Sequence, residues 1–471
     1  MNLKLNNKLA QLPNEIRIDR FESHDHSLEL FISWPAPSET RCPECSSCSC
    51  IGKGRTGIKT VYHVPIGTSA TYLSFSLQRF RCKDCGRYFT ERPSWLHNSL
   101  KITMLLYIST CIQLQSTESI KGISQTLRIP EKTVLSIMDS VDFSIPGNLP
   151  AVLCVDEFIG DTGTWNPDNK NFDTTRFHCN ICDGANGSVI DILPRIDLAF
   201  LESYTCNFSV SQRKSVKFFC TDMHGGFLSY AKRFFPDATI CVDMFHVIQM
   251  LNENINSVRR ALQNELKDNA DASRSWGDIR SAEDYIRKYS TLKGASRLLL
   301  TADANKAGRW KGKFHKNSER VTRLLEDSPE LEEAYTAMQE FHIILREPSY
   351  ILKRSLFSEF LDKYCNSSYE GTRHVAHTFR RNRAYIQNSW KYGYSNAVCE
   401  GQNNRIKIIK RNAYGLHSFR NFRQRILFAC GSTRFVTDSY TMSAERRINT
   451  AGNPDKNRSG KPESPSKKEV I

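Results

Sequence analysis

Three acidic residues stand where carboxylates could carry out phosphodiester chemistry. Asp156 ends the apolar run AVLCVD, Asp222 ends VKFFCTD, and Glu400 lies in SNAVCEGQNNRIKIIKR. An aspartate at the end of a buried strand places its carboxylate at the sheet edge, and two such strands with a helical glutamate can hold two divalent ions about 4 Å apart. Oxygen ligands suit Mg²⁺ or Mn²⁺. A single aspartate in such a position is more often a cap or turn residue, so the hypothesis depends on all three together.

The segment after Glu400 carries the positive charge that a phosphate substrate requires. Residues 401–430 contain seven lysines or arginines and no acidic residue. If the chain is helical from about residue 397, Glu400, Asn403, Asn404 and Lys407 share one face, which presents a metal ligand, then amides and a cation. A solvated face would mix both signs of charge, and this one does not. The basic track continues through Lys410, Arg411, Arg420, Arg423 and Arg425.

A second strand-like run, ATICVD, ends at Asp243 and is followed by His246 at the start of a long helix. Apolar residues from Val247 to Leu266 recur at helical spacing and predict the buried seam of that helix. His246 could donate to a phosphate or orient a carboxylate. A packed histidine that satisfies only local backbone is an alternative of equal weight.

Two Cys-x-x-Cys pairs near the N-terminus predict a structural Zn²⁺ site. Cys42 with Cys45, and Cys82 with Cys85, can each place two thiolates on one tetrahedral ion. The 36 residues between Cys45 and Cys82 would be spanned by a β-hairpin over about 58–80. Gly86 lets the backbone turn so that amides face the sulfurs. The neighbouring thiols of Cys48 and Cys50 leave the ligand set open, and unrelated thiols remain the alternative.

Cys179 and Cys182 share this spacing, but they lie in the strand-like segment FHCNICDG. Positions i and i+3 of a strand face opposite sides, so both are interpreted as core residues. The first 20 residues lack a signal peptide and no stretch is long enough for a membrane span, which predicts a cytoplasmic, nucleoid-associated protein with reduced thiols.

The 471-residue chain has a net charge of +15, which favours double-stranded DNA as a partner, although a solvated basic surface is the alternative. Residues 117–139 predict two helices separated by Arg128-Ile129-Pro130, the layout of a helix-turn-helix, with Lys132 and Thr133 at the exposed start of the second. An ordinary helical hairpin is the alternative.

Four zones and a tail follow from these patterns. We expect a zinc-finger DNA-binding domain over 1–95, a helix-turn-helix domain over 96–147, and a disordered basic tail over 436–471. Between them, residues 148–245 alternate short apolar runs with turns and predict strands, whereas 246–435 predict mainly helix. The fold class is therefore α/β.

Read together, these motifs resemble the ISL-three-type insertion-sequence transposases of bacteria. The resemblance rests on CPEC…RFRCKDCGRYFTE, on VDEF…VIDILPR…TDMHGGF…FPDATICVDMFHVIQ, and most strongly on NAVCEGQNNRIKIIKRNAYGLHSFRNFRQRIL. It implies a DDE triad at Asp156, Asp222 and Glu400. It also implies an RNase H-like core over 148–435, with a mixed sheet and an all-α insertion over about 245–390.

The resemblance implies a transposase that binds terminal inverted repeats and then cuts and joins DNA by two-metal chemistry. Because paired ends must be cut together, we expect a homodimer or a higher oligomer. Two rival functions remain at this point: a DNA-binding regulator that has lost the chemistry, and a metal-dependent nuclease that cuts without joining.

Overall fold

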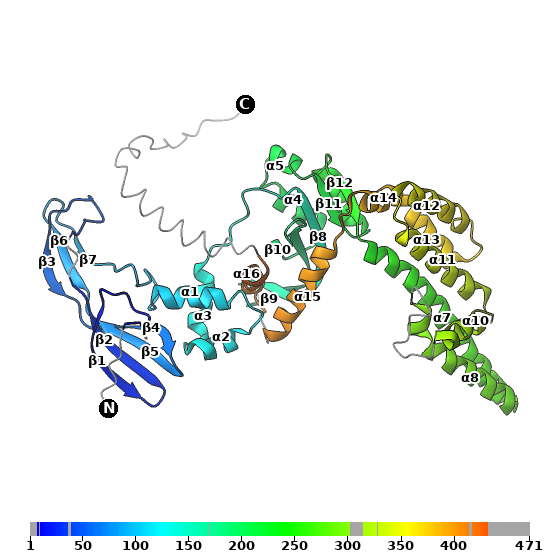
Figure 1. Cartoon of the computed structure of the whole chain (residues 1–471), viewed down its shortest axis with the longest axis horizontal. Helices are drawn as coiled ribbons and strands as arrows, with labels where there is room; N and C mark the ends of the chain where they lie inside the picture. Colours follow the sequence, from blue (N-terminus) through cyan, green and yellow to red (C-terminus); the bar gives the residue numbers. More distant parts are fainter. Residues whose placement is uncertain are drawn as a thin grey trace.

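The computed structural model describes residues 7–8, 10–35, 39–168, 170–301, 314–326, 328–413 and 417–431. The expected tail over 436–471 lies outside these ranges. The chain runs from a β-rich N-terminal part, through three short helices and a central sheet, to a long array of helices (Figure 1). Within the described ranges, no helix is both long enough and apolar enough to cross a membrane.

Two small sheets form the N-terminal part. One has the strand order β1-β2-β5-β4 and the other β3-β6-β7. The run TYLSFSLQRF contributes to both sheets, because β5 ends at Phe75 and β6 begins at Gln78 in the other sheet. The strands are β1 (Arg17–His24), β2 (Ser27–Ser33), β3 (Cys50–Arg55), β4 (Lys59–Ile66), β5 (Ser69–Phe75), β6 (Gln78–Cys82) and β7 (Tyr88–Thr90).

Three helices follow: α1 (Met104–Gln113), α2 (Ile120–Leu127) and α3 (Glu131–Ser140). The Ser119 side chain caps α2, and Arg128 ends it in the left-handed conformation with a φ of 53°. Pro130 then stands before α3, where its missing N–H costs no hydrogen bond. The break therefore falls at residues 128–130, where the sequence predicted it.

The central sheet contains five strands in the order β10-β9-β8-β11-β12. β8, β9 and β10 are antiparallel neighbours, whereas β11 and β12 run parallel to β8. Helices α4 (Leu198–Thr205), α5 (Val210–Lys214) and α6 (Gly225–Phe234) connect its strands. The strands are β8 (Val152–Asn166), β9 (Asn171–Asp183), β10 (Val189–Leu193), β11 (Phe218–Thr221) and β12 (Thr239–Val242).

A long helical stretch separates β12 from the last two helices. Its core includes the buried rings of Phe341, Phe357 and Phe379, which pack edge-on or tilted against one another or their neighbours. Its helices are α7 (Met244–Ser275), α8 (Ile279–Gly294), α9 (Ser296–Leu299), α10 (Phe314–Glu326), α11 (Pro329–Arg346), α12 (Tyr350–Tyr364), α13 (Glu370–Arg381) and α14 (Arg383–Tyr392). The chain then returns to the sheet as α15 (Ala397–Asn412) and α16 (Phe419–Cys430).

The two faces of the central sheet bury different partners. Leu153 and Val155 of β8 belong to the core that extends into the helical stretch, whereas Val152 and Cys154 belong to the core formed with α1–α3, α15 and α16. This alternation is the period of two expected for a strand buried on both faces. Helix α15 is thereby held against the sheet.

Candidate active site

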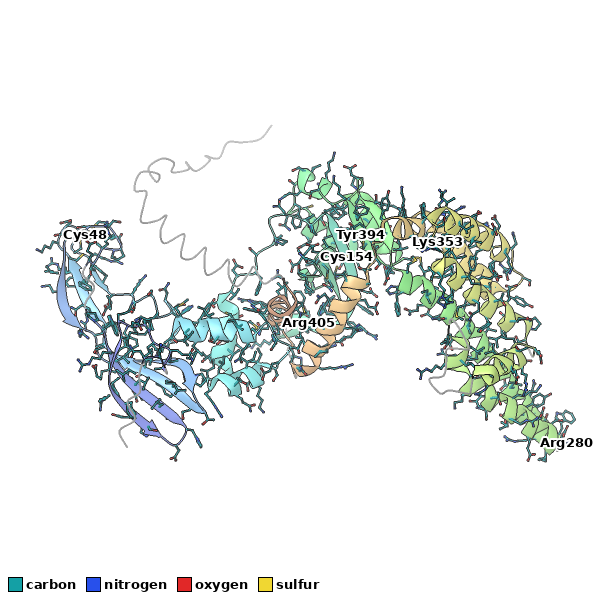
Figure 2. All side chains as sticks on the ribbon, viewed as in Figure 1. Cys48, Cys154, Arg280, Lys353, Tyr394 and Arg405 are labelled. Carbon is teal, nitrogen blue, oxygen red and sulfur yellow. The ribbon has the colours of Figure 1, made fainter. Side chains whose placement is uncertain are left out.

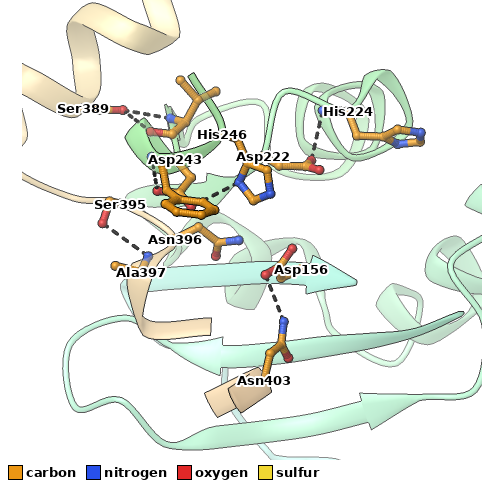
Figure 3. Close-up of polar contacts among 12 residues, drawn as sticks. Asp156, Asp222, His224, Asp243, His246, Ser389, Ser395, Asn396, Ala397 and Asn403 are labelled. Carbon is orange, nitrogen blue, oxygen red and sulfur yellow. Dashed lines mark hydrogen bonds and ion pairs between the residues drawn. The ribbon is translucent and has the colours of Figure 1, made fainter. Parts of the chain in front are cut away.

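Three aspartates lie abreast across the parallel strands. Cys154 of β8 is in register with Cys220 of β11, which in turn is in register with Cys241 of β12. Each cysteine is followed two positions later by an aspartate: Asp156, Asp222 and Asp243. Parallel register therefore brings together residues that are far apart in the chain. Figure 3 shows Asp222 and Asp243 on the same side of the sheet as the Asp156 side chain.

Asp156 does not end its strand, as the sequence suggested, because β8 continues to Asn166. The reason is that the antiparallel partner β9 pairs with β8 along its whole length, whereas β11 pairs only with residues 152–154. The edge on the β11 side therefore opens at Asp156 even though the strand continues. The Asp156 carboxylate therefore lies near the end of β11, as expected, although β8 itself does not end there.

The Asp156 carboxylate is buried, with 6% of the residue exposed. One oxygen, Oδ1, accepts from the Glu157 backbone N–H at 2.9 Å, and Oδ2 accepts from Nδ2 of Asn403 at 3.0 Å. Burial raises the pKa of Asp156 to about 7, against the opposing effect of the Glu157 N–H, and the negative charge of Asp222 raises it further. The Asp156 carboxyl is therefore shielded from water and lies near a second acidic residue, Asp222.

Asp243 and His246 form a pair at the start of α7. The Asp243 carboxylate accepts from the Phe245 backbone N–H at 3.1 Å and bonds Nδ1 of His246 at 3.2 Å. The hydrogen bond to Asp243 raises the pKa of His246, and the charges of Asp222 and Asp156 act in the same direction. Asp222 itself accepts from the His224 backbone N–H at 2.9 Å.

Glu400 lies half-buried in the first turn of α15, three residues before Asn403. Among the described residues, the only group of three or more metal-ligating side chains within 4.8 Å of one another consists of cysteines. The charges of Asp222, Asp243 and His246 all act on the Asp156 carboxyl, which places these residues near it, but Asp156, Asp222 and Glu400 do not all lie within 4.8 Å of one another. Asn403, one helical turn away, does reach Asp156.

The residues at this edge suit a divalent cation. Asp156 and Asp222 offer carboxylate oxygens, the donors that Mg²⁺ and Mn²⁺ prefer. Asn396, fully buried just before α15, donates from Nδ2 to the carbonyl of Val155 at 3.3 Å. Its own Oδ1 is buried without a donor in the described part of the chain. A buried oxygen without a partner, on a residue that contacts the β8 backbone one position before Asp156, fits a site for a cation or its water.

The face predicted on α15 is divided in the structure. Asn403 is buried and turned into the sheet, whereas Asn404 and Lys407 are exposed and bond each other at 3.3 Å. The prediction that Asn403 shares an open face with them is wrong, because its amide serves Asp156. Lys410 pairs with Asp161 at 2.6 Å, and Arg411 is exposed.

The basic track also ends earlier than expected. Arg423 pairs with the buried Asp191 at 2.6 Å, and the Arg425 guanidinium is buried, with only 2% of the residue exposed. Burial lowers the pKa of Arg425 to about 10. Arg420 stays exposed, 3.9 Å from Asp139. Arg423 and Arg425 are therefore structural residues, because α16 packs on the sheet and on α3 rather than facing solvent.

Arg425 donates to three backbone carbonyls in the segment between α1 and α2. Nη1 reaches the carbonyl of Leu114 at 2.5 Å, and Nη2 reaches those of Ser116 and Glu118 at 2.8 and 2.7 Å. Two residues of α15 bond the same segment: Arg405 reaches the Gln115 carbonyl at 3.1 Å, and Asn412 that of Thr117 at 2.7 Å. Figure 2 shows Arg405 between α15 and the α1–α3 helices.

The four predicted zinc ligands converge. The ligand atoms of Cys42, Cys45, Cys82 and Cys85 all lie within 4.8 Å of one another. The sulfurs of Cys42 and Cys85, and those of Cys45 and Cys82, are 3.5 Å apart. The backbone N–H groups of Cys85 and Asp84 lower the pKa of the Cys82 thiol to about 6, although burial opposes them. Thiolates are the form that binds Zn²⁺.

The two knuckles have the same backbone geometry. Gly86 has a φ of 73° and donates its N–H to the Cys82 carbonyl, and Ser46 has a φ of 59° and donates to the Cys42 carbonyl. Cys48, whose position Figure 2 marks, is exposed, and the group within 4.8 Å contains the two predicted pairs without Cys48 or Cys50. Cys179 and Cys182 are buried in the two different cores, as predicted.

The start of α3 is open to solvent. Lys132 is exposed there, and Thr133 is half-buried, with its N–H on the Pro130 carbonyl at 2.8 Å. The sequence reasoning missed Asn180, Asn396 and the structural role of Arg425. The sequence signal for Asn180 was a polar residue inside a buried strand. In the structure Asn180 of β9 stands in register with Asp156 of β8.

Two family models match the chain. One, of the ISL3 type of DDE transposases and described as "Transposase", covers residues 153–426. The other, described as "zinc-finger of transposase IS204/IS1001/IS1096/IS1165", covers residues 38–85 and so includes all four cysteine ligands. The chain is therefore a member of the transposase class. Because the first match spans more than half of the sequence, the chain belongs to the ISL3 family, as its motifs suggested.

Two curated relatives differ in how much they share. The transposase for insertion sequence element IS1001 of Bordetella parapertussis is 21% identical over 405 residues, which is 85% of this chain and 90% of that protein. A Lactococcus lactis subsp. lactis protein described as an ATP-dependent protease is 38% identical over 112 residues, 24% of this chain. That match spans only 34% of the Lactococcus protein.

Proposed function

We propose that this protein binds the terminal inverted repeats of an insertion sequence and catalyses metal-dependent DNA cleavage and strand transfer. Asp156, Asp222 and Glu400 are the proposed catalytic residues. The observation that carries the proposal is the parallel register of β8 and β11, which sets Asp156 beside Asp222 at one edge of the sheet. Glu400 joins them as a candidate because it lies one turn from Asn403, which contacts Asp156.

The sheet supports an RNase H-like core for residues 148–435. Its order, β10-β9-β8-β11-β12, combines an antiparallel meander with two parallel strands, and β12 leads into the helical stretch proposed as the insertion over about 245–390. We assign residues 1–95 to a zinc-finger domain and 96–147 to a helix-turn-helix domain. The exposed Lys132 at the start of α3 supports the second assignment.

The proposed chemistry has two displacements at phosphorus. Bound Mg²⁺ or Mn²⁺ would neutralise charge on the phosphate and activate the attacking oxygen. A water oxygen first bonds to phosphorus at the transposon end, and the bond to the 3′ oxygen breaks. The freed 3′-hydroxyl then attacks a target phosphate in line and expels a target 3′ oxygen. Asp156, Asp222 and Glu400 would hold the ions, and no protein atom bonds to DNA in either displacement.

The first experiment tests the proposed catalytic residues. Asp156→Asn and Glu400→Gln should abolish cleavage of an end-labelled transposon end in Mg²⁺ while mobility-shift assays show unchanged end binding. Glu253→Gln is the matched control, because Glu253 is an exposed helical carboxylate that accepts a hydrogen bond from Gln249 at 2.8 Å. Thermal denaturation verifies folding. Wild-type cleavage by both variants would remove the assignment.

The same preparation separates the rival functions. Joining of a pre-cut end to a supercoiled plasmid is expected for a transposase. A nuclease would cut without joined products, and a regulator would bind ends without cutting. Because two ends must be cut together, we expect joined products to come from a homodimer or larger assembly, which the mass of the DNA complex measures.

A further inference from the structure

Asn403 is held by more contacts than packing on the sheet requires. Its Nδ2 donates to Asp156 Oδ2 at 3.0 Å and to the Glu157 carbonyl at 3.2 Å. Its Oδ1 accepts from Nδ2 of Asn180 at 2.9 Å. Both amide hydrogens and the oxygen therefore have partners in a buried place, where an unpaired group would be costly.

The direction of this chain of hydrogen bonds is fixed. Asn180 Oδ1 accepts from the Cys182 thiol at 3.3 Å, and Asn180 Nδ2 donates to Asn403. Rotating the Asn403 amide by half a turn would set its oxygen against two acceptors, Asp156 Oδ2 and the Glu157 carbonyl. It would also set its Nδ2 against a donor. The Asp156 carboxylate and the Glu157 carbonyl therefore fix the direction of the relay, which runs from Asn180 through Asn403 to Asp156.

The relay joins the two elements that carry the proposed catalytic residues. Asn180 and Asp156 are paired across β9 and β8, whereas Asn403 belongs to α15, one turn after Glu400. Each Asp156 oxygen already accepts one hydrogen bond from a fixed donor and keeps a further lone pair for a cation. Figure 3 shows Asn403 contacting Asp156 from the side opposite Asp222 and His246.

We propose that Asn403, oriented by Asn180, is a positioning residue that holds the Asp156 carboxylate and helix α15 in one fixed relation. The hydrogen bond thereby fixes the start of α15, which carries Glu400, relative to the Asp156 carboxylate. The inference rests on the proposed function, because it assigns the purpose of the relay to that metal site. Hydrogen-bond partners of this kind typically contribute about 10- to 100-fold to metal affinity.

The test has two measurements on the full-length chain. The electron paramagnetic resonance signal of free Mn²⁺ reports how much Mn²⁺ the protein binds, and cleavage is followed as Mg²⁺ is titrated. Asn403→Leu keeps the volume and removes the hydrogen bonds. It should weaken Mn²⁺ binding by about 10- to 100-fold and raise the Mg²⁺ concentration for half-maximal cleavage in parallel. Asn254→Ala is the control, since it removes a buried amide bonded to Thr372, far from the sheet edge.

Asn180→Ala tests the relay without touching the contact to Asp156. It should weaken Mn²⁺ binding in the same direction, and the Asn180/Asn403 double variant should be no worse than Asn403→Leu alone, because both act through one path. Unchanged Mn²⁺ affinity in either folded single variant, or losses that add in the double variant, would overturn the relay. If wild type binds no more Mn²⁺ than Asp156→Asn, the proposed metal site fails, and the relay fails with it.

Discussion

At the scale of single residues, Asp156 is a carboxyl group buried at the edge of the central sheet. Burial raises its pKa to about 7 from an ordinary value of 3.8, and Asp222 contributes in the same direction. The folded protein therefore holds a proton on Asp156 more tightly than the unfolded chain does. That preference stabilises the fold fully below about pH 4 and is lost as the pH rises through 7.

The metal-free protein should accordingly lose stability relative to Asp156→Asn as the pH rises. Between pH 4 and 8 the difference in unfolding free energy should change by up to about 4 kcal/mol, since three pKa units are involved and an amide does not titrate. Denaturant unfolding in buffer without added Mg²⁺ or Mn²⁺ measures it, with the exposed Asp268→Asn as control. Added Mg²⁺ should restore the loss at pH 8 by binding the folded state. A difference that is constant with pH would contradict this account.

At the scale of elements, the N-terminal knuckles depend on a metal for their geometry, because four thiols converge without a disulfide. We expect one zinc ion per purified chain by elemental analysis. Cys82→Ser should lose that ion and unfold β3, β6 and β7, since binding and folding are coupled in such sites. Cys48→Ser is the matched control and should keep the ion, because Cys48 stands outside the cluster. Zinc loss from Cys48→Ser would show that the ligand set is different.

The elements also show how far the sequence could lead. Local patterns were enough for the two knuckles, the break before α3 and the aspartates after apolar runs, because each depends on neighbours in the chain. The continuation of β8 beyond Asp156 depends on its pairing with β9, and the buried role of Asn403 depends on contact with residues more than 200 positions away. Helical periodicity placed Asn403 on the same face as Asn404 and Lys407. Periodicity does not show which side of a helix packs against a sheet.

At the scale of the whole molecule, the DNA-reading and catalytic parts that we propose are joined through backbone carbonyls. Residues 114–118 connect α1 to α2, and every one of their carbonyls accepts from α15 or α16. Arg425 supplies three of these five bonds. The segment follows the end of α1, where the partial negative charge of the helix favours a cation. The helices before the sheet are therefore tied to α15, which carries Glu400, by the hydrogen bonds from Arg405 and Asn412.

Arg425→Met should break this connection, because it leaves three carbonyls without their donor in a buried place. We expect a loss of roughly 3 kcal/mol in unfolding free energy, typical of removing charge-assisted hydrogen bonds. Amide hydrogen exchange across residues 114–118 should accelerate more than in the core of β8. Arg420→Met is the control, since its distant pair with Asp139 is exposed and contributes less than about 1 kcal/mol. If residues 114–118 keep wild-type exchange in Arg425→Met, then Arg405 and Asn412 suffice to hold the segment, and α15 alone couples the two parts.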